Sequence, residues 1–258
     1  MTEHILIERP ASCPGVMAIW LNRPDKKNAI TAAMYRRMTE ALVEAERDDA
    51  VRVIAFLGTA GCFSAGNDMA DFLTYAQTSL MSGIPQEPAA FGLLKALATA
   101  TKPMVSGVDG LAIGIGTTLH MHCDLTIASD RSLFKTPFVD LALVPEAASS
   151  LLAPLVMGHQ RAFALLALGE GFSAEEAREA GLIWKVVSPE AVEMETLALA
   201  TSLAAKPAQA LKLARSLIRG DSSIILARMQ QELEHFVAQL QSAEARAAFE
   251  AFLSRKTQ

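Results

Sequence analysis

Cysteine is scarce in this sequence, and basic residues do not outnumber acidic ones. Its cysteines, Cys13, Cys62 and Cys123, are odd in number and far apart, which argues against a disulfide framework or a zinc cluster and favours a reducing compartment. A net charge of −5 gives no general attraction to nucleic acid or anionic membranes. No uncharged run is long enough to span a bilayer, and the opening MTEHILIERP lacks the features of a signal peptide. We therefore expect a cytoplasmic protein with neither a nucleic-acid nor a membrane partner.

Apolar residues, by contrast, are plentiful, at 51% of 258 residues, which is enough for a sizeable core. HILIERP and GVMAIWLNRP predict strands near the N-terminus, and residues 31–49 have helical spacing. Thr31 is the expected N-cap of that helix, and its apolar stripe consists of Met34, Met38, Leu42 and Ala45. Further strands and helices alternate up to about residue 170, which indicates α/β architecture.

Beyond about residue 170 the sequence predicts mainly helices. Ser173 and Glu176 form a capping box, and Gly181 is the expected stop. Residues 206–220 and 222–256 each predict one long amphipathic helix, which either caps the core or forms a subunit interface that also closes a site. Residues 74–88 have no clean period and are predicted to be an irregular surface segment.

Two small-residue loops could offer backbone amides to a ligand. SAGND, residues 64–68, follows a predicted strand, and DGLAIGIGTTLH, residues 109–120, places three glycines before a short helix. Free N–H groups and the helix dipole at such a point stabilise an anion or a developing oxyanion. Each loop alone is equally compatible with a tight turn, and the spacing fits neither a P-loop nor a dinucleotide fingerprint.

Glu146 is the only charged residue in LALVPEAASSLLAPLVMG, residues 141–158. A carboxylate in apolar surroundings is costly unless it has a partner or a task. One interpretation is structural, because an acid after Pro145 suits the N-terminus of a helix. The other is functional, because desolvation raises the pKa of a carboxyl group and makes it a better base.

Four motifs occur in the order LNRPDKKNAI, FSAGNDMADF, KPMVSGVDGLAIGIGTTLHMHCDLTIAS and SAEEAREAGLIWKVV. Together they resemble the crotonase superfamily, also called the enoyl-CoA hydratase/isomerase superfamily, over residues 4–255. The resemblance implies a crotonase-like ββα superhelix with a C-terminal helical region. It also implies an acyl-CoA-binding core, residues 1–195, and C-terminal helices, residues 196–258, for oligomerisation and site closure. The expected assembly is a homotrimer or a dimer of trimers, and no metal or cofactor is expected beyond the CoA of the substrate.

The same resemblance assigns site residues. The backbone amides of Asn67 and Ile115 are expected to hold the thioester oxygen, although the family more often has glycine at the second position. The residues expected to contact the substrate or its CoA are Ser64, Ala65, Gly66, Asn67, Asp68, Met69 and Gly114. Lys26 and Lys27 lie where the family approaches the nucleotide, and ordinary solvated lysines are the alternative.

Hydratases of this family carry two glutamates, and this sequence has Thr118 and Phe138 at the matching positions. LALVPEAASS instead resembles the Δ3,Δ2-enoyl-CoA isomerases, which implies that Glu146 is a single base that moves a proton from C2 to C4. His120 and His122, two residues apart on a helix, are poorly spaced for a metal. Asp140 is a possible second acid but is expected to be structural.

Two alternatives to the isomerase stay open. One is another crotonase-family acyl-CoA enzyme, such as a hydratase, hydrolase or decarboxylase. The other is a non-catalytic acyl-CoA binder that has kept the fold.

Overall fold

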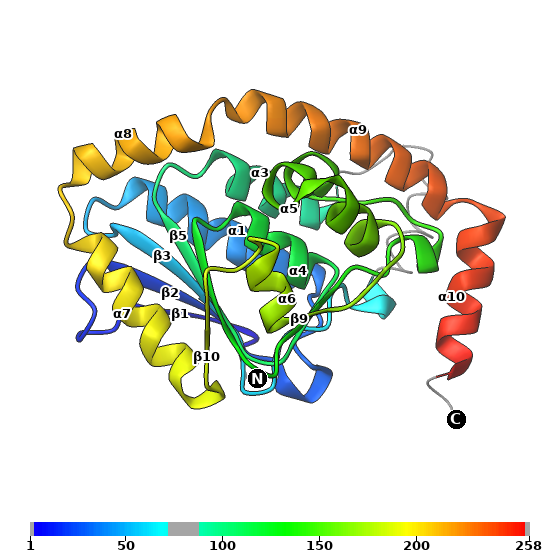
Figure 1. The fold of residues 1–258 in the computed structure, drawn as a ribbon, viewed down its shortest axis with the longest axis horizontal. Helices are drawn as coiled ribbons and strands as arrows, with labels where there is room; N and C mark the ends of the chain where they lie inside the picture. The colour runs from blue at the N-terminus through cyan, green and yellow to red at the C-terminus, as the bar shows by residue number, and fades with distance from the viewer. Residues whose placement is uncertain (1–2, 72–87, 256–258) are drawn as a thin grey trace.

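The computed structural model describes residues 3–71 and 88–255, with side chains placed as far as residue 251. A twisted six-stranded sheet lies at its centre (Figure 1), and all neighbouring strands are parallel except the first pair. In spatial order its strands are β1 (Ile5–Glu8), β2 (Val16–Leu21), β3 (Val53–Leu57), β5 (Met104–Val108), β7 (Leu125–Ser129) and β10 (Lys185–Val187). The α/β class predicted from the sequence is confirmed.

A second, smaller sheet packs beside the first. Its strands are β4 (Cys62–Ser64), β6 (Leu111–Ile113), β8 (Leu133–Lys135) and β9 (Phe172–Ser173). Along the chain β3 is followed by β4, β5 by β6 and β7 by β8, so each turn adds one strand to each sheet before the next helix. Strand β4 was not predicted from the sequence, because three residues are too few to show a period.

The helices of the core surround these sheets. They are α1 (Ala32–Arg47), α3 (Ala89–Thr99), α4 (Ile115–Thr118), α5 (Ser149–Leu166) and α6 (Ala174–Glu179), with short 3-10 turns η1 (Pro24–Lys26), η2 (Leu119–His122), η3 (Val139–Leu141) and η4 (Pro189–Ala191). The Thr31 hydroxyl accepts a hydrogen bond from the Met34 amide, and all four predicted stripe residues of α1 are buried. The predictions for this helix are confirmed.

Four helices complete the chain: α7 (Val192–Ala204), α8 (Ala208–Arg219), α9 (Ser222–Leu240) and α10 (Ala243–Arg255). Helices α8 and α9 cross the top of the molecule, and α10 descends along one side (Figure 1). The capping box of Ser173 and Glu176 is present as predicted. The single helix predicted for residues 222–256 is wrong: it breaks at residues 241–242, where the Ser242 hydroxyl caps the Ala245 amide and starts α10.

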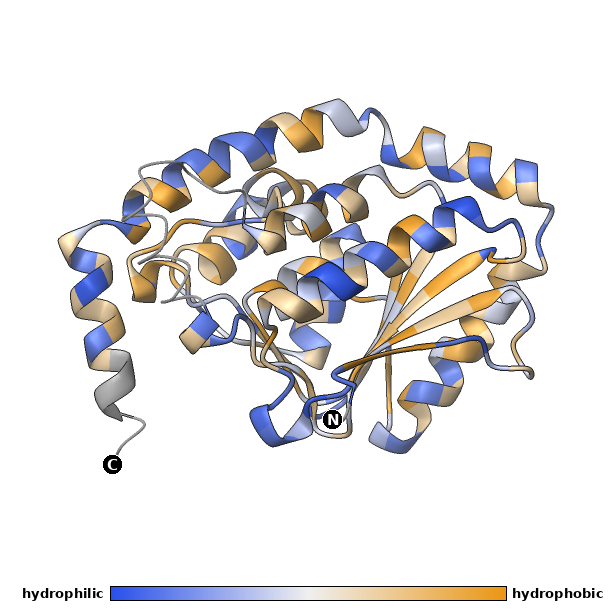
Figure 2. Cartoon of the chain, turned by 180° about the vertical axis from the view of Figure 1, so that it is seen from behind, coloured by the Kyte–Doolittle hydropathy of each residue, from blue (hydrophilic) through white to orange (hydrophobic). Residues whose placement is uncertain are grey.

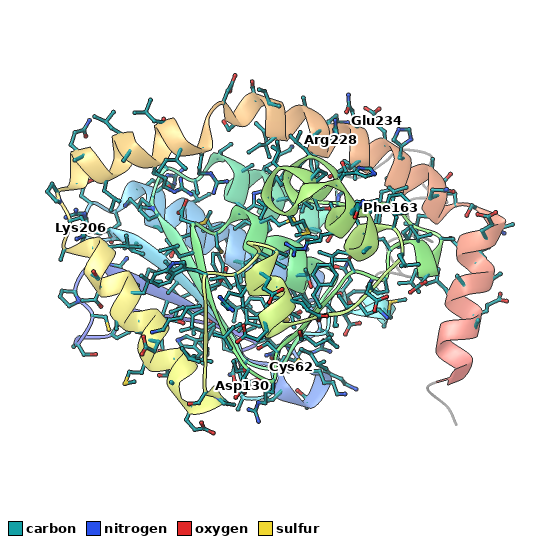
Figure 3. All side chains as sticks on the ribbon, in the orientation of Figure 1. Cys62, Asp130, Phe163, Lys206, Arg228 and Glu234 are labelled. Carbon is teal, nitrogen blue, oxygen red and sulfur yellow. The ribbon has the colours of Figure 1, made fainter. Side chains whose placement is uncertain are left out.

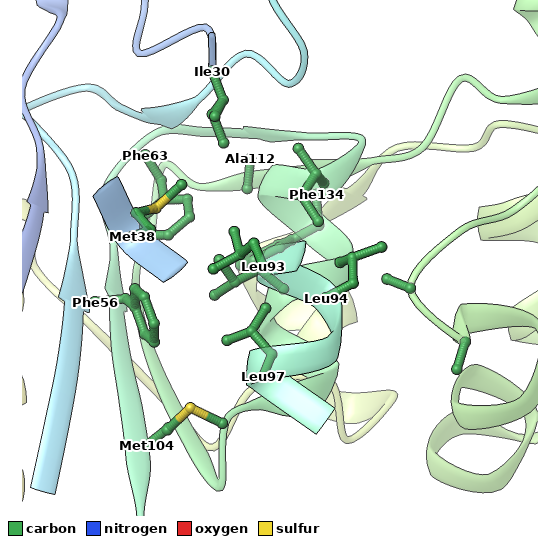
Figure 4. Packing of buried hydrophobic residues seen from close by; sticks show 14 of the residues in the cluster. Ile30, Met38, Phe56, Phe63, Leu93, Leu94, Leu97, Met104, Ala112 and Phe134 are labelled. Atoms are coloured by element: carbon green, nitrogen blue, oxygen red, sulfur yellow. The ribbon is translucent and has the colours of Figure 1, made fainter. Parts of the chain in front are cut away.

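The main core lies between the two sheets and α3, where Phe56, Phe63 and Leu97 are fully buried (Figure 4). The strands are hydrophobic along their length, whereas the C-terminal helices alternate hydrophobic and hydrophilic residues (Figure 2). None of the described helices is long and apolar enough to cross a membrane. The irregular segment predicted at residues 74–88 lies outside the described residues except for Pro88, which precedes α3. The division at residues 195 and 196 stays a prediction.

Candidate active site

The two predicted amide-bearing loops lie against each other because β4 and β6 are neighbours in the small sheet. A Cβ atom on Gly66 would lie 3.0 Å from the carbonyl oxygen of Ile113, and one on Gly116 would lie 2.9 Å from the carbonyl oxygen of Ser64. The contact at Gly116 is too close for a side chain, and the contact at Gly66 is tight in a residue whose φ of 89° also favours glycine, so the approach of the loops favours glycine at both positions. The structure therefore brings together two segments that are about fifty residues apart in the sequence.

The amides of Asn67 and Ile115 have no hydrogen-bond acceptor among the described residues. Beside Asn67, the Gly66 carbonyl and the Asp68 amide are both bonded to Ile30, which leaves the Asn67 amide unpaired. Ile115 is the first residue of α4, so its amide has no intrahelical acceptor. Ile115 as a whole is 1% exposed, and its side chain packs in the core.

A cavity of about 110 Å³ opens beside the first of these amides. Its walls are mainly apolar and are formed by α1, α3, α9 and the turn before α5; they include Ile30, Phe91, Leu94, Met229, Leu233 and Phe236. Its polar lining residues are Tyr35, Asn67, Asp68, Asp71, Glu146 and Glu232. The structure thus brings Glu146 and Asn67 into one cavity, whereas Ile115 and Gly114 do not line it.

Glu146 sits in a tightly fixed turn immediately before α5. The next two residues, Ala147 and Ala148, are both left-handed, with φ of 63° and 53°. The Ser149 amide donates to the Glu146 carbonyl at 3.0 Å, and Nε2 of His122 donates to the Ala147 carbonyl at 2.8 Å. In contrast to its well-bonded main chain, the buried Oε1 of Glu146 has no hydrogen-bond partner among the described residues.

Burial raises the pKa of Glu146 to about 7, and the nearby carboxylate of Glu232 acts in the same direction, while the Thr118 side chain opposes them. Burial, followed by the charge of Glu146, raises the pKa of Tyr35 well above its usual range. Tyr35 therefore stays protonated, and its hydroxyl donates to Oδ1 of Asn67 at 2.5 Å. Near neutral pH, Glu146 is thus available as a base, and the Asn67 side chain is fixed by a neutral phenol.

The second glutamate of the cavity, Glu232, was not predicted from the sequence. It is 6% exposed, and its Oε2 accepts the Ala148 amide at 2.6 Å. Its Oε1 accepts the amide and hydroxyl of Ser150, at 3.0 and 2.5 Å. A signal existed: Glu232 continues the buried stripe of Ile225 and Met229 along α9, where an apolar residue would be expected.

Other residues of the SAGND loop hold its main chain in place through hydrogen bonds and an ion pair. Burial favours a raised pKa for Asp68, but its 2.7 Å ion pair with Arg23 and its bonds to the Asp71 and Ala70 amides lower the pKa overall. Through these contacts Asp68 holds the main chain of this turn. The Ala65 amide donates to the Lys27 carbonyl at 2.9 Å.

The lysine pair and Met69 lie at the margin of the same loop. Lys26 and Lys27 are exposed beside it, and Met69 is half-buried against the core.

The other polar candidates lie elsewhere. Asp140 is exposed on η3 and does not line the cavity. Burial lowers the pKa of His120 to about 3 and that of His122 to about 4, so both imidazoles are neutral at physiological pH. His120 faces Ser106, with 2.9 Å between Nδ1 and Oγ, and His122 faces the Glu146 turn, so the two rings point to different partners. Thr118 and Phe138 are buried.

Comparison with known proteins identifies the family of this chain. Residues 12–258 match the family model described as enoyl-CoA hydratase/isomerase. The 1,2-epoxyphenylacetyl-CoA isomerase of Escherichia coli (strain K12) is 34% identical over 94% of each chain. The enoyl-CoA delta isomerase 2 of Rattus norvegicus is also 34% identical, over 94% of this chain and 62% of the rat protein.

A crystal structure described as an enoyl-CoA hydratase/isomerase from Pseudoalteromonas atlantica T6c superposes with a TM-score of 0.89. It is 32% identical, and the match covers 98% of both chains. The crotonase-like fold expected from the sequence motifs is thereby confirmed. With a family model spanning nearly the whole sequence and this likeness in fold, the chain belongs to the enoyl-CoA hydratase/isomerase family, the crotonase superfamily.

Proposed function

We propose that the protein is a Δ3,Δ2-enoyl-CoA isomerase, an enzyme that moves the double bond of a 3-enoyl-CoA to the 2,3 position. The observation that carries this proposal is the contrast between the two glutamates that line the cavity. The buried Oε1 of Glu146 has no hydrogen-bond partner in the part of the chain that the structure describes, whereas both oxygens of Glu232 accept bonds from the turn before α5. A single glutamate with an unbonded oxygen suits isomerisation, which needs one base. Hydration, the addition of water, would need a second acidic group.

The chemistry follows from this arrangement. The Glu146 carboxylate removes a proton from C2, and the electron pair is delocalised onto the thioester oxygen to give a dienolate. The amides of Asn67 and Ile115 stabilise that oxygen, and loss of one such donor typically costs about 10²–10³ in rate. The protonated Glu146 then returns the proton at C4, which leaves the double bond between C2 and C3. No hydride or electron leaves the substrate, so this step requires no redox cofactor.

Substrate binding is assigned to the segments around the cavity. The apolar side chains of α3 and α9 hold the acyl chain and keep water from the base, which would otherwise be solvated. The loop from Ser64 to Met69, together with Gly114, lies along the thioester and pantetheine. Lys26 and Lys27, which are exposed at the outer end of that loop, approach the nucleotide phosphates.

The test is turnover of cis- and trans-3-hexenoyl-CoA, followed by the absorbance of the conjugated product. We expect Glu146→Gln to lower kcat by at least about a hundredfold, because proton transfer by a positioned group contributes about 10²–10⁴. Glu234→Gln is the matched control, since Glu234 is exposed on α9 (Figure 3), and it should retain wild-type activity.

Two outcomes would contradict the assignment. Rapid hydration of a 2-enoyl-CoA that survives Glu146→Gln would indicate another reaction of the family. Calorimetric binding of CoA esters without turnover of any acyl-CoA would indicate a non-catalytic binder.

A further inference from the structure

The turn that carries Glu146 leads into a helix whose N-terminus has no cap of its own. The N-cap position of α5 is Ala148, which has no side-chain acceptor and is left-handed. Exposed amides at a helix start need acceptors, which a local Ser, Thr, Asp or Asn normally provides. Here the acceptor is Glu232, which is 84 residues away on α9 and receives the amides of Ala148 and Ser150.

These contacts determine where Glu146 points. Its main chain is held between the Glu232 carboxylate, which binds the Ala148 amide, and His122, which binds the Ala147 carbonyl. Two successive alanines with positive φ are conformationally costly, so the surrounding contacts must maintain them. Without the carboxylate, the turn would lose its only described side-chain acceptor for these amides.

The charge of Glu232 acts on the same group as its hydrogen bonds. Glu146 and Glu232 line one cavity, and two nearby carboxylates disfavour each other's ionisation. Burial raises the pKa of Glu232, but the Ser150 and Ala148 donors and the charge of Arg228 oppose that rise. The Arg228 guanidinium reaches the Ser150 hydroxyl at 3.2 Å (Figure 3 labels Arg228 on α9).

The other titratable and charged groups near the pair come from four elements. They are Tyr35 on α1, Asp68 and Asp71 after β4, His122 on η2, and Arg228, Glu234 and His235 on α9. Tyr35 and His122 are both neutral near pH 7, and Asp68 is paired with Arg23. Glu232 is therefore the anion that acts most directly on Glu146, as the causes of the raised Glu146 pKa also indicate.

We propose that Glu232 is a positioning residue for the base: from α9 it fixes the turn that aims Glu146, and its negative charge keeps Glu146 a stronger base. The proposal rests on the isomerase function assigned above, in which Glu146 is the base. Glu232 is not itself a second acid, because both of its oxygens are occupied by the turn. Through Glu232, helix α9 acts directly on the chemistry as well as forming a wall of the cavity.

The experiment is the pH profile of kcat/KM for wild type, Glu232→Gln and Glu232→Asp, with Glu234→Gln as control. Glu232→Gln removes the charge and retains one acceptor, so the acidic limb should move to lower pH by about one unit. Glu232→Asp retains the charge but is too short to reach both amides, so the limb should stay in place while kcat falls about tenfold. If Glu232→Gln lowers kcat/KM by the same factor at all pH values, the proposal is overturned.

A second measurement does not depend on turnover and so separates this proposal from the isomerase assignment. In protein labelled with ¹³C at the glutamate Cδ, the resonance missing in Glu146→Gln identifies Glu146. Its titration midpoint should fall by about one unit in Glu232→Gln, whether or not any 3-enoyl-CoA is converted. An unmoved midpoint would refute the role of the charge. If Glu232→Gln does not fold, the titration curve of Glu146 in the wild-type protein tests the role of the charge by itself. Electrostatic coupling between Glu146 and Glu232 predicts a second inflection in that curve, and a simple one-site curve would contradict the proposal.

Discussion

Glu146 is costly to the folded protein for the same reason that it is useful to the reaction. Its carboxyl group is removed from water, its Oε1 has no described partner, and burial raises its pKa from 4.5 to about 7. A carboxyl group with a raised folded-state pKa favours folding only while it is protonated. Ionisation therefore costs more in the folded chain than in the unfolded one, and the cost appears as the pH rises between these two values.

We expect Glu146→Gln to stabilise the protein above pH 7 and to have little effect below pH 4.5, because glutamine resembles the protonated acid. The shift corresponds to at most about 3 kcal/mol at pH 8. Urea denaturation of both proteins at pH 5 and pH 8 measures the difference. A variant that is less stable at pH 8, or a difference that does not vary with pH, would show that the carboxylate is well solvated or paired.

Single residues differed in how far the sequence could predict them. Glu146 could be predicted because a lone charge in an apolar run is visible in a short window. His122 and Glu232 could not, because their contacts with the Glu146 turn join residues 25 and 84 positions apart. Glu232 in particular has the appearance of an ordinary helical surface acid until its place on the buried stripe of α9 is noticed.

At the scale of elements, the site depends on the turn from β6 into α4. Gly114 has φ of 58° and ψ of −120°, a conformation that side chains strongly disfavour, and it directs the Ile115 amide away from the β6–β8 ladder. A Cβ atom at Gly114 would meet no atom within 4 Å, so any effect of substitution there is conformational rather than steric.

Gly114→Ala should therefore lower kcat by about tenfold to a hundredfold, with a loss of about 1–2 kcal/mol in the free energy of unfolding. Gly220→Ala is the matched control. Gly220, between α8 and α9, has φ of 71° and ψ of −154° and is equally open. Gly220→Ala should therefore cost a similar amount of stability but keep most of the activity. Steady-state kinetics and thermal melts of both variants test this, and equal losses of activity would argue against a specific role for the Ile115 amide.

Elements were predictable where their patterns were long. The α1 helix and its Thr31 cap follow from sixteen residues of clear spacing, whereas the strands of the small sheet, at two or three residues each, show no period. The break between α9 and α10 was missed because helical spacing continues through Ser242 and only its capping bond to Ala245 marks the new start. The contact between the two glycine loops depends on these short strands, so the sequence indicated each loop but not their packing.

At the scale of the whole molecule, the outer face of α8 is unusually apolar. Leu213, Leu217 and Ile218 are 54%, 84% and 85% exposed, and Ile224 at the start of α9 is 59% exposed. Helix α8 lies at the periphery (Figure 1), and none of its residues lines the Glu146 cavity. Large aliphatic side chains exposed next to one another commonly mark a surface that another chain covers. We propose that this face contributes to the trimer implied by the sequence motifs.

Full burial of a leucine or isoleucine side chain is worth about 1.5–3 kcal/mol, so two per subunit would contribute substantially to a three-fold interface. We expect light scattering to give about three or six times the 27.6 kDa chain mass for wild type, as a homotrimer or a dimer of trimers requires, and a monomer for the double variant Leu217→Asp, Ile218→Asp. Circular dichroism should show that this variant keeps its helices, because neither side chain packs in the core. Phe163→Asp is the comparison, since Phe163 is 60% exposed on α5 (Figure 3). Dissociation by Phe163→Asp alone would place the interface on α5 instead, and a monomeric wild type would exclude the trimer.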